Sequence, residues 1–266
     1  MTLDTMPRLG LGTWELEGDD ARNSVQTALD LGYRHIDTAQ MYENEKEVGR
    51  GLSASDVDRD EMWLTTKLNV KNLAPDDVTT STEDSLRKLD TDHLDLLLIH
   101  WPVAIDTVEQ TLDAMQKLQD RGLTRHIGVS NFTSDQFTRA TKVAQITTNQ
   151  VEYHAMLDQS AVLQAVRSAG ADLTAYSPLG RGELLDHPVM VNIAGARSAH
   201  PAQIALRWLL DQDAVVAVPK ATGEDHLQSN LEVLSMPPLQ PEDTAAIDQI
   251  PKDNRIIDPP FAPDWD

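Results

Sequence analysis

Four side chains that can hold or move protons lie at or just beyond the ends of apolar, strand-like runs. They are an acid, a phenol, an amine and an imidazole: Asp37, Tyr42, Lys67 and His100. In a barrel of parallel strands the carboxyl ends meet on one face, where such barrels place their chemistry. A buried ammonium favours a neighbouring phenolate and should lower the tyrosine pKa, and an acid beside the lysine keeps it charged. Because an imidazole can hydrogen-bond a carbonyl oxygen, the set predicts a proton-donating site suited to carbonyl reduction.

Two other kinds of chemistry find no support in the residue types. The chain has no cysteine, which excludes a disulfide framework and a thiolate nucleophile. Its 8 histidines show neither H-x-H nor H-E-x-x-H spacing. We therefore expect no metal cofactor.

The charge of the chain is strongly negative, at −21. Of the 22 basic residues, 8 are lysine and 14 are arginine, and the acidic residues are scattered rather than gathered in a tail. Nucleic acid and anionic membranes are poor partners for such a surface. We interpret the charge as that of a cytoplasmic protein from a halophilic, salt-accumulating microbe; the alternative is an ordinary mildly acidic surface.

The chain also lacks the segments that direct proteins to or across membranes. It has no run of about 18 apolar residues that could cross a membrane. Residues 1–9 do not form a basic, apolar signal peptide. We therefore expect a cytoplasmic protein without membrane partners.

Apolar runs typical of strands alternate with helical patterns along the whole chain. Eight strands are predicted, over residues 9–13, 33–37, 62–67, 94–100, 126–130, 147–152, 172–176 and 215–219. Helical periodicity occupies residues 20–31, 76–89, 107–119 and 159–169; two of these stretches are followed directly by a glycine, and a third lies shortly before Gly122. Eight strands separated by helices favour a (β/α)8 TIM barrel over an open sheet.

The length of 266 residues suits one such barrel, so residues 1–266 are predicted to form a single domain. Two segments exceed the simple alternation. Residues 181–211 are too long for one connection and are predicted to hold two helices, the second beginning near Pro201. Residues 254–266 are rich in proline, cannot form a regular helix, and are expected to lie across the barrel mouth.

Eight motifs, in order along the chain, resemble those of the aldo-keto reductases, especially the compact prokaryotic branch that reduces aldehydes and diketogluconate. They are Gly10-Leu11-Gly12-Thr13-Trp14, Gly32-Tyr33-Arg34-His35-Ile36-Asp37-Thr38-Ala39, Asn44-Glu45, Leu98-Ile99-His100-Trp101-Pro102, Gly128-Val129-Ser130-Asn131-Phe132, Asn149-Gln150-Val151-Glu152-Tyr153, Ala175-Tyr176-Ser177-Pro178-Leu179-Gly180 and Val218-Pro219-Lys220. Each motif alone is weak evidence, but eight in order are specific. The family is a barrel that binds NADP(H) or NAD(H) without a Rossmann fold.

The resemblance implies a monomeric enzyme that reduces small-molecule aldehydes or ketones. Tyr42 would be the general acid, supported by Asp37, Lys67 and His100. Trp14 and Trp101 would line the substrate pocket. Cofactor contacts are implied for Gly12, Thr13, Ser130, Asn131, Gln150, Tyr176, Ser177, Leu179, Gly180, Lys220, Thr222, His226 and Asn230. Alcohol oxidation as the working direction, or a non-catalytic regulatory subunit that senses the cofactor, remain alternatives.

The sequence contains residues that favour NADP(H) and one that weakens that preference. Lys220 can pair with the 2′-phosphate of NADP, and Thr222 and Asn230 can add hydrogen bonds. His226 stands where the family usually has an arginine, and it offers only a partial charge near neutrality. We expect a modest preference for NADP(H), with NAD(H) also used.

Overall fold

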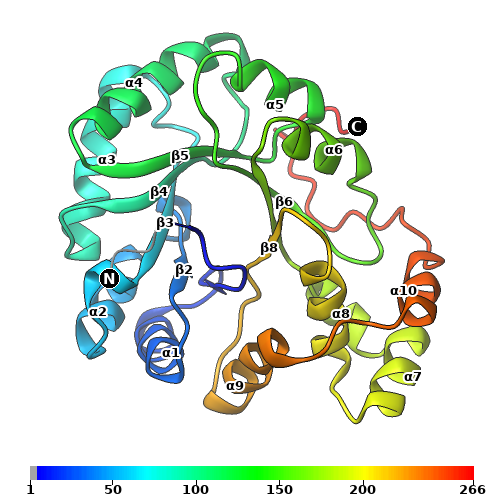
Figure 1. Ribbon diagram of the computed structural model, residues 1–266. Coiled ribbons are helices and arrows are strands. Elements are labelled where there is room, and N and C mark those ends of the chain that lie inside the picture. Colours follow the sequence, from blue (N-terminus) through cyan, green and yellow to red (C-terminus); the bar gives the residue numbers. More distant parts are fainter. Residues whose placement is uncertain (1–4) are drawn as a thin grey trace.

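A computed structural model, which describes residues 5–266, shows eight parallel strands in one curled sheet surrounded by helices (Figure 1). The order in the sheet follows the chain, and each strand pairs in parallel with the next. The predicted (β/α)8 barrel is confirmed. The strands are β1 (Leu11–Gly12), β2 (His35–Asp37), β3 (Trp63–Leu68), β4 (Leu94–Ile99), β5 (Thr124–Ser130), β6 (Thr148–Glu152), β7 (Asp172–Tyr176) and β8 (Val215–Ala217).

Backbone hydrogen bonds between the first and last strands close the barrel. Gly10 N donates to Ala217 O at 2.9 Å, and Gly12 N donates to Pro219 O at 3.0 Å. A Cβ atom on Gly12 would lie 2.6 Å from the carbonyl oxygen of Val218. Glycine is therefore required at this position, next to the predicted site, because no side chain fits between the two strands.

Helices cover the outside of the sheet and begin and end at residues that suit helix termini. α3 has a proline at its first position, and α1 is followed by Gly32 in the left-handed conformation with φ 116°. The long segment after β7 contains two helices, as predicted, the second beginning at Pro201. The helices are α1 (Gly18–Leu31), α2 (Glu45–Ala54), α3 (Pro75–Leu89), α4 (Val108–Asp120), α5 (Ser134–Ala140), α6 (Ser160–Ser168), α7 (Pro188–Arg197), α8 (Pro201–Leu210), α9 (Glu224–Glu232) and α10 (Pro241–Asp248).

Two apolar regions hold the barrel together and leave one end of its interior polar. The larger core lies between the sheet and the helices, and β3 and β4 are buried along their whole length, as parallel strands covered on both faces are. A small second cluster contains Met6, Trp63, Leu96, Leu98 and Val216. Side chains alternate along a strand, so Lys67 lies on the same face of β3 as Trp63, four residues later. The interior thus changes from apolar to charged toward the carboxyl ends of the strands.

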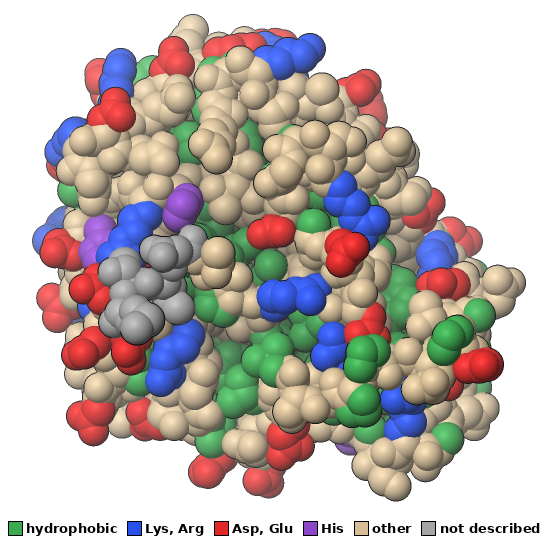
Figure 2. Space-filling model, in the orientation of Figure 1, with side chains coloured by type: hydrophobic (Ala, Val, Ile, Leu, Met, Phe, Trp, Pro, Cys, Tyr) green, Lys and Arg blue, Asp and Glu red, His purple; other side chains and the backbone are tan. Residues whose placement is uncertain are grey.

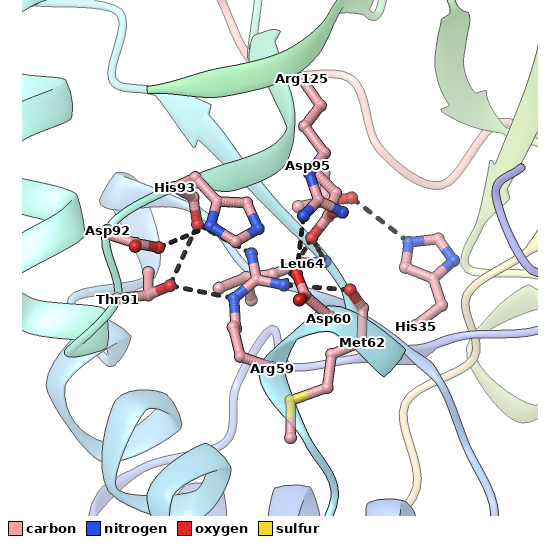
Figure 3. Close-up of polar contacts among 11 residues, drawn as sticks. His35, Arg59, Asp60, Met62, Leu64, Thr91, Asp92, His93, Asp95 and Arg125 are labelled. Carbon is pink, nitrogen blue, oxygen red and sulfur yellow. Dashed lines mark hydrogen bonds and ion pairs between the residues drawn. The ribbon is translucent and has the colours of Figure 1, made fainter. Parts of the chain in front are cut away.

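At the opposite, amino-terminal ends of β3, β4 and β5, a buried carboxylate joins the three strands (Figure 3). Asp95 accepts a hydrogen bond from Leu64 N at 2.9 Å and forms ion pairs with Arg59 at 2.8 Å and Arg125 at 2.9 Å. Arg59 also donates to the carbonyl oxygen of His93 at 2.8 Å. A fully buried carboxylate needs such partners, because an unpaired buried charge is costly.

On the face shown in Figure 2, acidic side chains are dispersed, with basic ones between them, rather than gathered in a single patch. Within residues 5–266, no helix is long and apolar enough to span a membrane. Residues 1–4, on which the expectation about a signal peptide partly depends, lie outside the described residues.

Candidate active site

The lysine, acid and phenol singled out in the sequence lie together at the carboxyl ends of β2 and β3. Lys67 Nζ donates to Asp37 Oδ1 at 2.6 Å, to the carbonyl oxygen of Thr38 at 2.9 Å and to Tyr42 Oη at 3.3 Å. The parallel pairing of Asp37 with Thr65 puts the acid near the lysine, and a short 3-10 turn, Gln40–Tyr42, returns the phenol to the same place. The side chains of Lys67 and Asp37 are 1% and 3% exposed. The ammonium is thus fully engaged and shielded from water.

Burial decides the acid–base properties of the pair, and one expectation from sequence was wrong. Burial raises the pKa of Tyr42, and the nearby Lys67 ammonium, which lowers it, does not offset that effect. The pKa of Tyr42 therefore lies above its ordinary value rather than below it. Burial also opposes the charge on Lys67, but Asp37 and Tyr42 outweigh it and the pKa of Lys67 is raised. The expectation that the acid keeps the lysine charged is confirmed.

His100 completes the set from the loop after β4. Its ring meets that of Tyr42 edge to face, with centroids 5.6 Å apart. Burial, and then the Lys67 ammonium, hold the pKa of His100 well below its usual range, so the imidazole is neutral. Its Nδ1 is buried and has no hydrogen-bond partner among the described residues.

A second polar group lines the wall formed by β5, β6 and β7, where contacts to a nicotinamide were predicted. Asn131 Nδ2 donates to the carbonyl oxygen of His100 at 3.0 Å, and Tyr176 Oη donates to Asn131 Oδ1 at 2.8 Å. Ser130 Oγ donates to the carbonyl oxygen of Gln150 at 2.8 Å. Gln150 Nε2 donates to Asp37 Oδ2 at 2.7 Å. The two groups predicted separately are therefore one connected network.

A pocket of about 830 Å³ opens over this network. That volume suits a cofactor or small-molecule site, for which about 300–1,000 Å³ is usual. Both predicted substrate residues, Trp14 and Trp101, line it. Eight of the predicted cofactor residues also line it: Gly12, Thr13, Asn131, Gln150, Tyr176, Ser177, Leu179 and Lys220.

The other five predicted cofactor residues do not line the pocket. Ser130 and Gly180 are buried behind it, and Gly180, with φ 56°, would meet Met156 Cε at 2.6 Å if it had a Cβ atom. Thr222 and His226 are exposed at the start of α9, with His226 Nδ1 3.2 Å from the carbonyl oxygen of Thr222. Asn230 is buried further along the same helix.

Some pocket residues lie in segments expected near the barrel mouth but were not singled out from sequence. Arg181 lies in the turn after β7 in a left-handed conformation, with φ 51°, and its guanidinium carbon is 4.3 Å from the centre of the Trp14 ring. Residues of the C-terminal segment line the pocket as well, among them Ile256, Ile257 and Phe261. The expectation that this segment crosses the barrel mouth is confirmed. The glycines beside Arg181 are the only signal that could have marked that turn.

The donor set suits a dinucleotide cofactor better than a metal ion. Gln150 Oε1 accepts no hydrogen bond from the described residues, so it can accept one from a carboxamide. Lys220 is exposed at the pocket and forms no ion pair within residues 5–266, which leaves it able to bind a phosphate. Across the same residues, no group of three or more histidine, cysteine or acidic side chains could hold a metal ion.

Comparisons with known proteins identify a family of similar chains. The model of the "Aldo/keto reductase family" matches residues 8–252. The chain is 39% identical to "Methylglyoxal reductase DkgB" of Escherichia coli O157:H7, over 98% of this chain and 99% of that protein. It is also 39% identical to "Glyoxal reductase" of Bacillus subtilis, over 94% and 91% of the two chains.

Solved structures extend the likeness to the whole fold. A crystal structure of a candidate 2,5-diketo-D-gluconic acid reductase B superimposes with a TM-score of 0.95, at 40% identity, over 98% of this chain and 94% of that one. An aldo-keto reductase from a Medee basin deep-sea metagenome library, MGS-M4, gives a TM-score of 0.91 at 34% identity, over 96% and 94%.

Proposed function

The chain belongs to the aldo/keto reductase family, and from that premise we propose that it is a nicotinamide-dependent reductase of small aldehydes and ketones. The observation that carries the proposal is the position of Lys67, which lies between Asp37 and Tyr42 beside a neutral His100. All four side chains adjoin the pocket that would receive the substrate, and three of them, Asp37, Tyr42 and His100, line it directly.

Tyr42 is the proton donor in this proposal. Its Oη lies 3.3 Å from Lys67 Nζ, so the phenolate that remains after donation is stabilised by the ammonium. The raised pKa of Tyr42 means that the proton stays on the phenol until an oxygen with developing negative charge is next to it. His100, being neutral, can hydrogen-bond the carbonyl oxygen and hold it facing Tyr42 without competing as an acid.

A bound nicotinamide would supply the two electrons, as a hydride. Asn131 and Gln150 would hold its carboxamide, with Ser130 supporting them from behind, and Tyr176 would stack on the ring. Ser177, Leu179 and Lys220 lie where they could contact the phosphates. The resident network of hydrogen bonds means that these side chains are already oriented before binding.

The substrate class proposed is small α-oxoaldehydes, because relatives of this chain are named methylglyoxal reductase and glyoxal reductase. Aromatic side chains, Trp14, Trp101 and Phe261, provide an apolar wall for such molecules. We further propose that the enzyme is monomeric, as the family resemblance implies, and that it is a cytoplasmic protein of a salt-accumulating microbe, on the ground of its −21 charge. NADP(H) is favoured over NAD(H) chiefly by Lys220, to which Thr222, His226 and Asn230 would add weaker contacts.

A steady-state assay tests the proposal. Purified protein is mixed with methylglyoxal or glyoxal and reduced cofactor, and the loss of reduced nicotinamide is followed. Tyr42→Phe should lower the rate by about 10²–10⁴-fold, because it removes the proton donor and keeps the ring. Cofactor affinity, measured by fluorescence titration, should be nearly unchanged. Wild-type turnover by Tyr42→Phe would exclude Tyr42 as the acid, and no turnover of any aldehyde by the natural chain would exclude the function.

A further inference from the structure

The C-terminal strap, which we define as residues 252–266, forms the outer wall of the pocket. It follows α10 and contains no helix. Figure 1 shows it, in red, passing from α10 to the neighbourhood of α5. Ile256, Ile257 and Phe261 of the strap line the same pocket as Tyr42 and His100. A substrate that extends away from the reacting carbonyl group can therefore contact it.

The two ends of the strap are fixed by contacts with the loops around the barrel mouth. At its start, Asn254 N donates to Met156 O at 3.0 Å, and Asp158 N donates to Lys252 O at 3.1 Å. At its end, both oxygens of the Asp266 side chain accept hydrogen bonds from Ser134, at 2.8 Å and 2.7 Å. Between these points the backbone lacks ladder partners, because the strap belongs to no strand.

One buried carboxylate holds the middle of the strap. Glu152, the last residue of β6, is 1% exposed. Its Oε1 accepts a hydrogen bond from Ile256 N at 2.9 Å, and its Oε2 accepts one from Ile257 N at 2.8 Å. Two consecutive backbone amides are thus satisfied by the two oxygens of a single side chain that lies more than 100 residues earlier in the sequence. Each is a charge-assisted hydrogen bond, the stronger kind.

We propose that Glu152 is a positioning residue that fixes the C-terminal strap as a wall of the substrate pocket and so sets how tightly the larger, non-reacting part of a carbonyl substrate is bound. It takes no part in proton transfer, since it contacts none of the proposed catalytic side chains. The part of this inference that concerns substrates rests on the proposed reductase function. The part that concerns the anchor does not.

The ionised form of the side chain is what the anchor requires. A carboxylate can accept at both oxygens, whereas the amide of a glutamine would point an N–H donor at one of the two backbone N–H groups. Burial opposes the charge on Glu152, but hydrogen bonds from His154, Ile256 and Ile257 outweigh it and the pKa of Glu152 is lowered. The other charged or titratable groups that act on it are Arg255 from the strap and Tyr176 from β7.

The competing explanation is that Glu152 only stabilises the loop after β6 through its contact with His154 Nε2 at 3.0 Å. In that case its loss would reduce the thermal stability of the whole protein. It would not change the substrate range or selectively expose the strap. The test must therefore measure the strap itself.

The experiment compares Glu152→Gln with Glu183→Gln by hydrogen exchange of peptides covering residues 252–262. Glu183 accepts a hydrogen bond from the Asn254 side chain, at 2.8 Å, and a glutamine can still accept it, so this variant controls for lost charge near the strap. Glu152→Gln should accelerate exchange there by about tenfold or more, with little change in peptides of β3. Unchanged exchange would overturn the anchor.

Kinetics with a bulky and a small aldehyde then test the effect on substrates. For Glu152→Gln, the KM for benzaldehyde should rise several-fold relative to the KM for methylglyoxal. The kcat for methylglyoxal and the Kd for NADPH should change less than about twofold, because neither involves the strap. Equal losses for both aldehydes and the cofactor would overturn the positioning role.

Two further controls keep the result interpretable. If Glu152→Gln does not fold, Glu152→Asp retains the charge but is too short to reach both amides, and it should give the same pattern more weakly. If the natural protein reduces no aldehyde, the proposed function fails together with the substrate part of the inference. The exchange data still decide the anchor in that case.

Discussion

Gln150 donates a hydrogen bond of 2.7 Å from its Nε2 to Oδ2 of Asp37, while Oδ1 of the same carboxylate accepts from Lys67. One carboxylate therefore joins the side of the pocket proposed to hold the cofactor to the side proposed to donate the proton. A substitution on either side should therefore affect the groups on the other side, because removing one partner leaves a buried polar atom without a hydrogen bond.

The coupling of these two residues can be measured with a double-mutant cycle. Gln150→Ala and Asp37→Asn should each lower kcat/KM, and the double variant should lose less than the sum of the two. We expect an interaction energy of about 0.5–3 kcal/mol, as found for residues in one network. A control cycle of Asp37→Asn with Trp14→Phe should be additive within about 0.5 kcal/mol. Additivity in the first cycle would contradict the shared network.

The pH dependence of reduction follows from three pKa directions. Activity needs Tyr42 and Lys67 protonated and His100 neutral; the first two have raised pKa values and the third has a lowered one. All three required states therefore persist across neutrality. The kcat/KM should be flat from about pH 7 to about pH 9 and fall only above the ordinary phenol value of about 10.

The raised pKa of Lys67 also predicts how this residue contributes to the free energy of unfolding at different pH values. Because the folded-state pKa of Lys67 is raised, its contribution is complete below the unfolded value of about 10.5 and is lost as the pH rises through the folded value. The expected pH dependence of reduction is checked by a profile of kcat/KM against pH, measured with saturating cofactor. A limb that falls between about pH 6 and 8 would show that a different group controls the reaction.

Cofactor preference should depend on Lys220, which faces the pocket without an ion-pair partner in the described chain. Lys220→Ala should raise the KM for NADPH by about tenfold, equivalent to about 1.4 kcal/mol, and leave NADH nearly unaffected. Lys142→Ala, which removes an exposed lysine that does not line the pocket, is the matched control. Equal effects on both cofactors would place Lys220 away from the 2′-phosphate.

His226 gives a second, smaller test of the same site. It is exposed at the start of α9, so His226→Arg would put a permanent charge there and should tighten NADPH several-fold. Comparing kcat/KM for both cofactors in the natural chain and in His226→Arg decides this; an unchanged preference would place residue 226 away from the 2′-phosphate.

The sequence was most informative where a function depends on the end of a strand. Asp37, Lys67 and His100 were each predicted at strand ends, and the parallel register brings them together. Trp14 and Trp101 were likewise predicted at the pocket. These predictions succeeded because strand patterns are local and the barrel geometry then fixes where strand ends meet.

The errors came from properties that local patterns do not contain. The pKa of Tyr42 was predicted to fall because the lysine was recognised, whereas the extent of burial was not visible in the sequence. No role was predicted for Glu152, although it lies in one of the eight motifs, because its partners, Ile256 and Ile257, are more than 100 residues away along the chain. Helices α2 and α9 were not singled out, because they are short and their apolar positions are few.

Salt should stabilise this protein, since 43 acidic residues face 22 basic ones and the acidic side chains are dispersed over the surface. The Debye length falls from about 30 Å at 0.01 M to about 3 Å at 1 M, so repulsion among carboxylates is screened at high salt. The midpoint of thermal unfolding should rise with KCl concentration. Sucrose, which screens no charge, is the control, and a flat midpoint in KCl would give the acidity another cause.

The attachment of Asp266 to Ser134 has a practical consequence for work with the purified enzyme. The side chain of the last residue is part of the rim of the mouth, and the neighbouring Trp265 packs against Trp101, with ring centres 6.1 Å apart. An affinity tag fused after Asp266 would therefore emerge beside the substrate entrance. Met6, by contrast, packs with Trp63 at the other end of the barrel interior, away from this entrance.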